Sequence, residues 1–174
     1  NSYNNSDGIY IANSDRISIC NSNIYTNTDD GVDTYSALKF YITESNIYNN
    51  TYRGLEFEES QGVASNCNFT DNYYGAFVDR SILKTRYCSF ENVNTGIYAN
   101  QKSTVDSIQC WWGNETGPYN NINNPTGTGD TVSTNVLFDP WQNTLYQPDD
   151  LLSNMLCHIN DKNWRVVYPD DETP

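Results

Sequence analysis

Five glycines divide the N-terminal part of the chain into repeats of nearly constant length. Gly8, Gly31, Gly54, Gly75 and Gly96 follow one another at intervals of 23, 23, 21 and 21 residues. After each glycine, apolar residues alternate with polar or aromatic ones, which is typical of a β-strand with one buried face. A repeat this short cannot bury its apolar face alone, so successive repeats must bury one another.

Three columns of residues keep the same phase through the repeats. The first is the inward side of the strand that follows each glycine, and it contains the pairs Ile9/Ile11, Val32/Thr34, Leu55/Phe57, Ala76/Val78 and Ile97/Ala99. The second contains Ser22, Ser45, Cys67, Cys88 and Cys110, followed two residues later by Ile24, Ile47, Phe69, Phe90 and Trp112. Two residues further on, at asparagine-rich corners, lie Thr26, Asn49, Asp71, Asn92 and Asn114. The third contains Ile17/Ile19 and Phe40/Ile42, and it is weaker at Ala64, Leu83 and Val105.

Three short strands per repeat with a fixed register predict an all-β solenoid of about five to six coils, in which like residues lie about 4.8 Å apart. The chain resembles the right-handed parallel β-helix repeats of the pectate-lyase-like superfamily, whose members include lyases, glycosidases, and surface-layer and adhesion proteins. A β-sandwich also has many short strands. It does not predict a constant repeat length with an identical inward and outward phase.

The pattern changes toward the end of the solenoid. Residues 110–141 contain Trp111, Trp112 and Trp141 among several glycine and proline turns, and they resemble the closing segment of such β-helices. A final coil exposes strand edges that must be covered or paired. We therefore expect one domain over residues 1–141, closed by a cap over 110–141.

Residues 142–174 fall outside the repeat. Their pattern predicts a short amphipathic helix over 151–159 and a strand over 164–168. We expect this tail to pack either on its own β-helix or on a neighbouring subunit. The chain enters its first repeat without a comparable cap, so self-association through the ends of the solenoid or through the tail is a further expectation.

Acidic residues outnumber basic ones by 22 to 9, which gives a net charge of −13. A nucleic-acid partner is not expected, because neutralising phosphates requires clusters of Lys and Arg. No run of about 18 apolar residues provides a membrane-spanning helix. The first residues lack the charged start and apolar stretch of a signal peptide, so we expect a mature or trimmed product or a cytosolic protein.

An acidic face is expected on the outward side of the strands that follow the glycines. Five carboxylates should cluster there around Arg53, namely Asp30, Asp33, Glu56, Glu58 and Asp79. Stacked like charges destabilise a sheet, and Ca²⁺ would relieve the repulsion because it takes several carboxylate oxygens. In the lyases that the chain resembles, this face carries calcium carboxylates and an Arg or Lys base, which implies a Ca²⁺ site here and Arg53 as the base. The alternative is a solvated acidic face without a cofactor, which the sequence favours because no further basic residues are evident.

One motif resembles the polygalacturonase-type glycosidases, which cleave with paired carboxylates. It is Asn27-Thr28-Asp29. The remaining motifs of that family are absent, and the only histidine, His158, lies in the tail. We therefore do not expect this glycosidase activity.

Aromatic side chains on the outward face indicate a candidate binding surface. Tyr10, Phe77 and Tyr98 fall on the same face as the carboxylates. They are candidates for stacking on the sugar rings of a polysaccharide. They equally suit a protein interface, where tyrosine is enriched.

The cysteines leave two alternatives open. Cys67, Cys88 and Cys110 share one column, where buried cysteine acts as a small apolar residue. Vertical neighbours are also close enough for a disulfide. The odd count of five permits an intermolecular bridge, for which Cys157 in the tail is the candidate.

Four Asn-x-Ser/Thr sequons occur, at Asn4, Asn49, Asn68 and Asn114. Together with the acidity and the family resemblance, these candidate glycosylation sites favour an extracellular or cell-surface location.

Two hypotheses about function follow. The first is a non-catalytic extracellular or cell-surface module with a structural, adhesive or self-assembling role. The second is a carbohydrate-binding or polysaccharide-cleaving module that uses the acidic and aromatic face.

Overall fold

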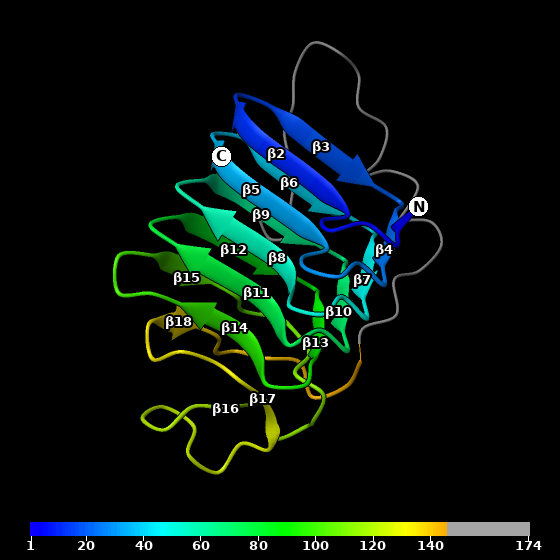
Figure 1. Cartoon of the computed structure of the whole chain (residues 1–174). Helices are drawn as coiled ribbons and strands as arrows, with labels where there is room; N and C mark the ends of the chain where they lie inside the picture. The colour runs from blue at the N-terminus through cyan, green and yellow to red at the C-terminus, as the bar shows by residue number, and fades with distance from the viewer. Residues whose placement is uncertain (146–174) are drawn as a thin grey trace, which may run out of the picture.

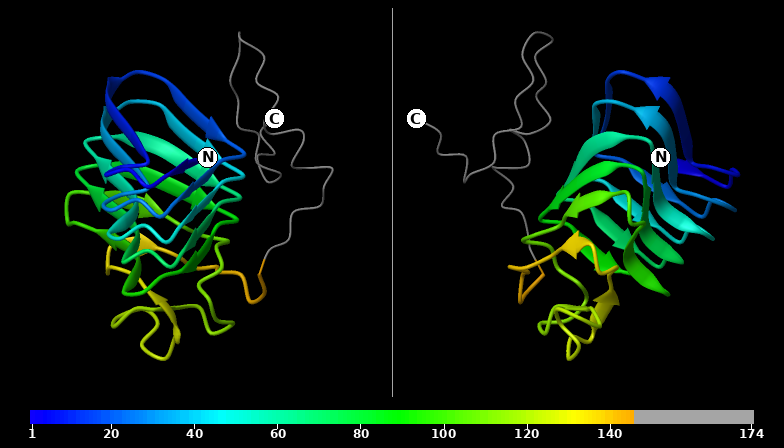
Figure 2. Two further views of the ribbon diagram at one scale, coloured as in Figure 1. Left: turned by 45° about the vertical axis from the view of Figure 1, so that its right-hand side comes forward. Right: turned by 90° about the vertical axis from the view of Figure 1, so that its left-hand side faces the viewer.

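The computed structural model describes residues 1–145, and they form a parallel β-helix (Figure 1). Successive coils lie one above another along the axis, from the N-terminal coil to a closing segment at the opposite end (Figures 1 and 2). Each full coil contributes one strand to each of three parallel sheets. No helix long and apolar enough to cross a membrane occurs within residues 1–145.

We call the three sheets A, B and C, and each takes every third strand of the solenoid. Sheet A contains β1 (Ser2–Tyr3), β4 (Asn23–Tyr25), β7 (Asn46–Tyr48), β10 (Asn68–Thr70) and β13 (Ser89–Glu91). Sheet B contains β2 (Ile9–Ser14), β5 (Val32–Ala37), β8 (Arg53–Glu58), β11 (Tyr74–Asp79) and β14 (Thr95–Ala99). Sheet C contains β3 (Ile17–Cys20), β6 (Phe40–Thr43), β9 (Gln61–Ser65), β12 (Ile82–Arg86), β15 (Thr104–Asp106) and β18 (Val136–Leu137).

The predicted columns are confirmed by the strand register. Val32 pairs with Ile9 on one side and with Leu55 on the other, and all three side chains point to the same face of sheet B. In sheet A, the rings of Phe69 and Phe90 stack with their centroids 5.1 Å apart. The interior of the solenoid is therefore filled by like residues in vertical contact, which buries apolar surface that no single coil could bury.

The glycine period has a steric cause. A Cβ atom at Gly54 would lie 2.6 Å from the carbonyl oxygen of Gly75 and 2.9 Å from Nδ2 of Asn72. The neighbouring coil approaches the backbone too closely for any side chain at this position. The regular spacing of the glycines therefore marks a place where neighbouring coils approach too closely for a side chain.

Left-handed backbone conformations recur at the corners. Thirteen non-glycine residues within the described part have positive φ, and five of them are asparagine. The others include Arg80 (φ 47°) and Tyr87 (φ 54°). Asparagine tolerates this region best. The expectation of asparagine at the corners is thus correct only in part, because packing between coils imposes the conformation on other residues as well.

Asparagines at successive corners form an inner ladder, which we define as Asn27, Asn50, Asn72 and Asn92. The first three are buried and Asn92 is half-buried. Each side-chain amide donates to the next along the axis, at 2.8, 3.0 and 3.2 Å, and Asn92 donates to Oδ2 of Asp130 at 3.0 Å. The side chains also accept backbone N–H groups of the preceding coil, as Asn72 Oδ1 does from Asn50 N at 3.1 Å. The backbone N–H groups at these corners therefore keep hydrogen-bond partners although they are shielded from water.

Asn92 lies in a different column from the one that the sequence predicts. The periodicity places it with Thr26, Asn49 and Asp71, but it occupies the inner ladder below Asn72. Phe90 pairs with Phe69, but Asn92 follows Phe90 by two residues whereas Asn72 follows Phe69 by three. The corner before Asn92 is therefore one residue shorter, which brings Asn92 into the inner ladder.

The closing segment continues the core columns for a partial coil. Trp112 is fully buried and stacks on Phe90 at 4.8 Å, and Val136 pairs with Val105. A chain excursion that contains β16 (Pro118–Tyr119) and β17 (Gly129–Thr131) projects beyond the last coil (Figure 1). The helix and strand expected in the tail lie outside the described residues.

Candidate functional site

The candidate site lies on the outer face of sheet B, where β5, β8 and β11 run side by side. Arg53 is the first residue of β8, and Asp30 lies two residues before the start of β5. Alternation along β8 turns Glu56 outward while Leu55 and Phe57 are buried. The sequence therefore predicts the composition of this surface, and the structure supplies its contacts.

Arg53 is enclosed on several sides. Its guanidinium Nη1 donates to Oδ2 of Asp30 at 3.1 Å and to Oε2 of Glu56 at 2.5 Å. Its Cζ lies 4.2 Å from the centroid of the Tyr52 ring and 4.6 Å from that of Phe77. These are cation–π distances. The side chains of Arg53 and Asp30 are 15% and 3% exposed, so the ion pair is largely shielded from water.

The protonation states of this cluster follow from burial and charge. Burial lowers the pKa of Arg53, but Asp30 and Glu56 outweigh it and the pKa is raised overall. Burial raises the pKa of Asp30, and burial together with the neighbouring Asp30 carboxyl group raises the pKa of Glu56. Burial and the charge of Asp30 raise the pKa of Asp33 to about 6. A lyase base must be deprotonated to abstract a proton, and Arg53 is held in its protonated form.

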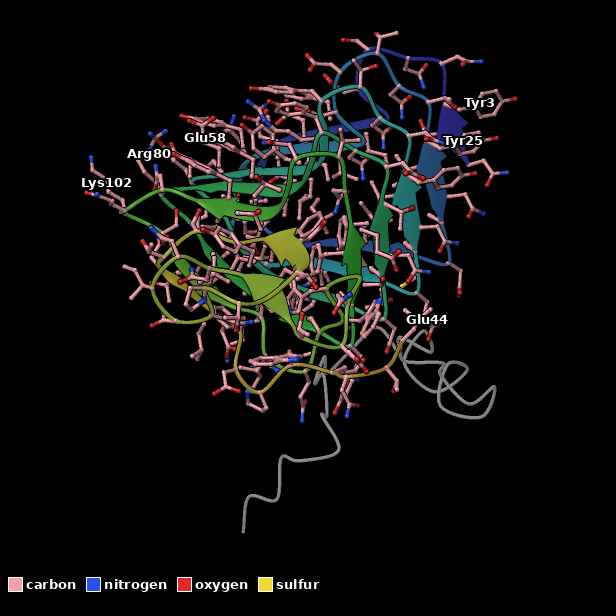
Figure 3. The ribbon with its side chains drawn as sticks, turned by 90° about the horizontal axis from the view of Figure 1, so that it is seen from below. Tyr3, Tyr25, Glu44, Glu58, Arg80 and Lys102 are labelled. Carbon is pink, nitrogen blue, oxygen red and sulfur yellow. The ribbon has the colours of Figure 1, made fainter. Side chains whose placement is uncertain are left out.

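The five carboxylates do not form the single cluster that the sequence predicts. Glu58 and Asp79 are neighbours in register, and both contact Arg80, which also binds Glu59 at 3.1 Å. Figure 3 shows Glu58 and Arg80 close together, at the C-terminal ends of β8 and β11. No group of three or more His, Cys, Asp or Glu side chains within residues 1–145 is arranged to hold a metal ion. The expected calcium site does not fit these residues, because Arg53 pairs with Asp30 and Glu56 while Arg80 pairs with Glu58 and Asp79.

The aromatic residues of this face also differ in their availability. The Phe77 ring stacks on Tyr98 at 5.2 Å on one side and lies against Arg53 on the other. A sugar needs a free ring face for stacking, so Phe77 is poorly placed for it. Tyr10 and Tyr98 are 64% and 43% exposed. Tyr52 is a contact that the sequence analysis missed, although it directly precedes Arg53 and repeats as Tyr73 in the next coil.

The cysteine column consists of thiols. Cys67, Cys88 and Cys110 are buried and free, which corresponds to the packing alternative rather than to a disulfide among them. Burial raises the pKa of the Cys88 and Cys110 thiols. Cys157 lies outside the described residues.

The sequons occupy different environments. Asn4 and Asn49 are exposed at corners with positive φ. Asn114 accepts the backbone N–H of Thr116 at 3.0 Å. Nδ2 of Asn68 donates to Asn46 at 2.8 Å, so a glycan on that nitrogen would compete with this hydrogen bond.

A second surface feature lies on the outer face of sheet A. The rings of Tyr3, Tyr25 and Tyr48 stack along the axis at 5.2 and 4.9 Å, and Figure 3 shows Tyr3 and Tyr25 outside the sheet. Beyond Tyr48 the surface is hollowed by about 500 Å³. The periodicity does not predict this hollow, because Leu145, which follows the closing segment, contributes to its wall.

These contacts and sheets define a parallel β-helix with a rigid polar and aromatic face. Residues 1–136 match the family described as "Right handed beta helix region". The chain therefore belongs to the right-handed β-helix family, and its fold is consistent with the pectate-lyase-like superfamily. No curated protein and no solved structure matches the chain.

Proposed function

We propose that the protein is a non-catalytic β-helix module with a structural or adhesive role outside the cell. The observation that carries this proposal is the enclosure of Arg53 by Asp30, Glu56 and two aromatic rings. Arg53, the residue best placed to serve as a lyase base, is therefore a cation with a structural role. The net charge of −13 and the four sequons support an extracellular location.

The experiment is an assay on a panel of acidic polysaccharides, read as the ultraviolet absorbance of unsaturated uronic products. We expect no product from the wild-type protein or from Arg53→Ala. Product formed by the wild type and lost in Arg53→Ala would show that the enclosed arginine is catalytic. The adhesive and structural role is tested separately, by electron microscopy and mass photometry for assemblies and by retention on immobilised glycans. A protein that stays monomeric and is retained by no glycan would contradict that role.

Glycan binding is the second candidate, favoured by the exposure of Tyr10 and Tyr98 beside the carboxylates of sheet B. Tyrosine rings stack on sugars, and carboxylates accept hydrogen bonds from sugar hydroxyl groups. Tyr98→Ala should reduce retention on a neutral glycan gel, while Tyr119→Ala, a similarly exposed tyrosine in the projecting excursion, should not. Equal retention of both variants would exclude the sheet B face as the glycan site.

A further inference from the structure

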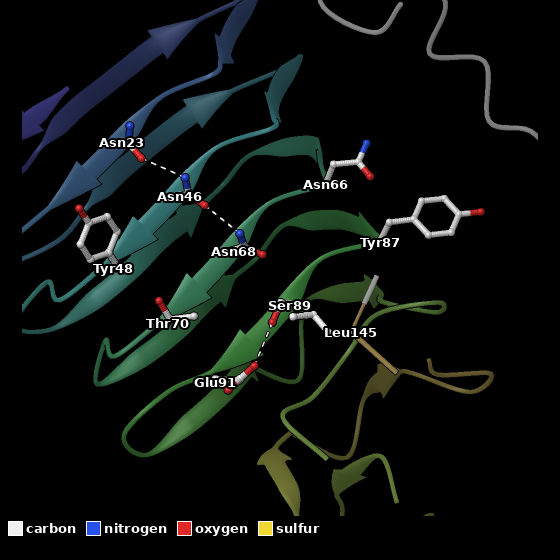
Figure 4. Close-up of a pocket in the computed structure, with 10 residues that line it drawn as sticks. All are labelled: Asn23, Asn46, Tyr48, Asn66, Asn68, Thr70, Tyr87, Ser89, Glu91 and Leu145. Atoms are coloured by element: carbon white, nitrogen blue, oxygen red, sulfur yellow. Dashed lines mark hydrogen bonds between the residues drawn. The ribbon is translucent and has the colours of Figure 1, made fainter. Parts of the chain in front are cut away.

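The hollow on sheet A is lined almost entirely by uncharged polar side chains. Asn23, Asn46 and Asn68 form one side (Figure 4). The other lining residues are Tyr48, Asn66, Thr70, Tyr87, Ser89, Glu91 and Leu145. Glu91 is the only charged residue among them, and no lysine or arginine of the described chain takes part.

The amides on this side have a common direction. We define the outer ladder as Asn1, Asn23, Asn46 and Asn68. Asn68 donates to Asn46 at 2.8 Å, Asn46 to Asn23 at 2.9 Å and Asn23 to Asn1 at 3.3 Å. Every N–H bond therefore points toward the N-terminal coil, and the aligned dipoles leave the carbonyl of Asn68 as their negative end.

The next coil beyond that negative end carries a carboxylate. Asn68 pairs with Ser89 in the next coil, and Glu91 lies two residues further along the same strand. The indole Nε1 of Trp111 donates to Oε1 of Glu91 at 3.1 Å, which fixes the carboxylate at the wall of the hollow. Asn66, also in the wall, has a buried Oδ1 without a hydrogen-bond donor. Carboxylate and amide oxygens thus lie in the wall of the hollow, and no lysine or arginine among residues 1–145 lines it.

The inner ladder shows the opposite arrangement. Its amides donate toward the C-terminal coil, and Asn92 ends the series by donating to the carboxylate of Asp130 at 3.0 Å. There the positive end of the dipoles meets a negative charge. On the outer ladder the negative end lies on the side of Glu91, an exposed carboxylate that accepts hydrogen bonds from Trp111 and Ser89. A positive group between Asn68 and Glu91 would therefore be stabilised by both.

We propose that the hollow is a binding site for an alkylammonium group, carried either by a free polyamine or by the lysine side chain of a partner. An ammonium has three donors for oxygen acceptors. The rings of Tyr48 and Tyr87 and the side chain of Leu145 offer apolar surface for its methylene stem. A divalent metal ion would need more than the one carboxylate present. The net charge of −13 attracts cationic ligands to the protein.

The test is a titration of the protein with 1,5-diaminopentane, with 1,5-pentanediol as the uncharged probe of the same length. Binding is followed by calorimetry and by the ¹⁵N-indole signal of Trp111, which reports locally on Glu91. We expect the diamine to bind and shift this signal, and the diol to do neither. Glu91→Gln should weaken diamine binding by at least about tenfold.

Glu115→Gln is the matched control, because it makes the same change in net charge at an exposed residue that does not line the hollow. It should change the affinity by less than about twofold. Circular dichroism checks that both variants are folded. If both variants weakened diamine binding equally, the effect would be a general attraction between opposite charges. That result would overturn the proposal. Binding of the diol as tight as that of the diamine, or displacement of the diamine by an equal concentration of Mg²⁺, would also overturn it.

A blocked tripeptide with a central lysine distinguishes the two sources of the ammonium. Tighter binding of the peptide than of the diamine would support the lysine of a partner. Tighter binding of the diamine would support a free polyamine. The outcome is independent of the proposed non-catalytic role, since the hollow and Arg53 lie on different sheets.

Discussion

Asn72 offers the sharpest test of how the solenoid is held together. Its side chain is completely buried. Its Oδ1 accepts from the backbone N and from Nδ2 of Asn50 at 3.1 and 3.0 Å, and its Nδ2 donates to Ile47 O and to Asn92 Oδ1 at 3.0 and 3.2 Å. Asn72→Ala removes all of these, and at about 1 kcal/mol for each the free energy of unfolding should fall by roughly 4 kcal/mol. That is a large part of the stability of a domain of this size.

Asn46→Ala is the matched control, because Asn46 has the corresponding position in the outer ladder. Its side chain makes two hydrogen bonds along that ladder, at 2.9 and 2.8 Å. Water can replace them at the surface, so the expected cost is below about 1 kcal/mol. The measurement is urea unfolding followed by circular dichroism, with the slope m compared between variants to check that the transition is the same. A cost for Asn72→Ala no larger than that for Asn46→Ala would refute the claim that the buried ladder stabilises the corners.

Three further predictions follow from buried groups. Burial raises the pKa of Asp130 to about 6, so the folded protein disfavours its charged form and the wild type loses stability as the pH rises from about 4 to 6. Asp130→Asn should remove the contribution of Asp130 to this loss, so the variant should gain stability relative to the wild type as the pH rises over that interval in thermal melts. Arg53→Met should cost about 3 kcal/mol at neutral pH, because it leaves Asp30 buried without its cation. The cost should shrink in acid as Asp30 is protonated, whereas Arg80→Met, at a side chain 40% exposed, should cost less. Among the described thiols, the half-buried Cys20 should react with a maleimide in the folded protein, and the three buried ones only after unfolding. Intact mass without reductant checks this, and buried thiols that stay unreactive after unfolding would contradict the free state.

The fold was predictable because one physical requirement repeats in every coil. Gly54 and its equivalents mark a close approach between coils, and the alternation after them separates buried from exposed side chains. Both signals are local in the sequence, and stacking them needs only a constant period. The register of Val32 with Leu55 follows directly. The inner ladder was also within reach, because an asparagine precedes the glycine by three or four residues in each of these coils.

The contacts of the site were less predictable because they depend on side-chain directions between neighbouring columns. The sequence places Arg53 among five carboxylates, but it does not reveal that Arg80 removes Glu58 and Asp79 from that group. It also does not show that stacking uses both faces of Phe77. Aromatic residues in one column of a solenoid contact one another through their ring faces. Their exposed fraction alone therefore overstates the ring surface that is free to bind a ligand.

The direction of an amide ladder is a further property that residue types do not determine. Asparagine side chains in a column can donate toward either end of the solenoid, and the hydrogen bonds along the column are equivalent in both cases. The groups at the two ends decide which direction is stable. Asp130 receives the last N–H of the inner ladder, which explains that direction without any ligand. Within residues 1–145, no carboxylate accepts the last N–H of the outer ladder, whose carbonyl end lies one coil from Glu91. If an ammonium group occupies the hollow, Glu91→Gln should therefore weaken its binding while leaving the hydrogen bonds of the outer ladder intact.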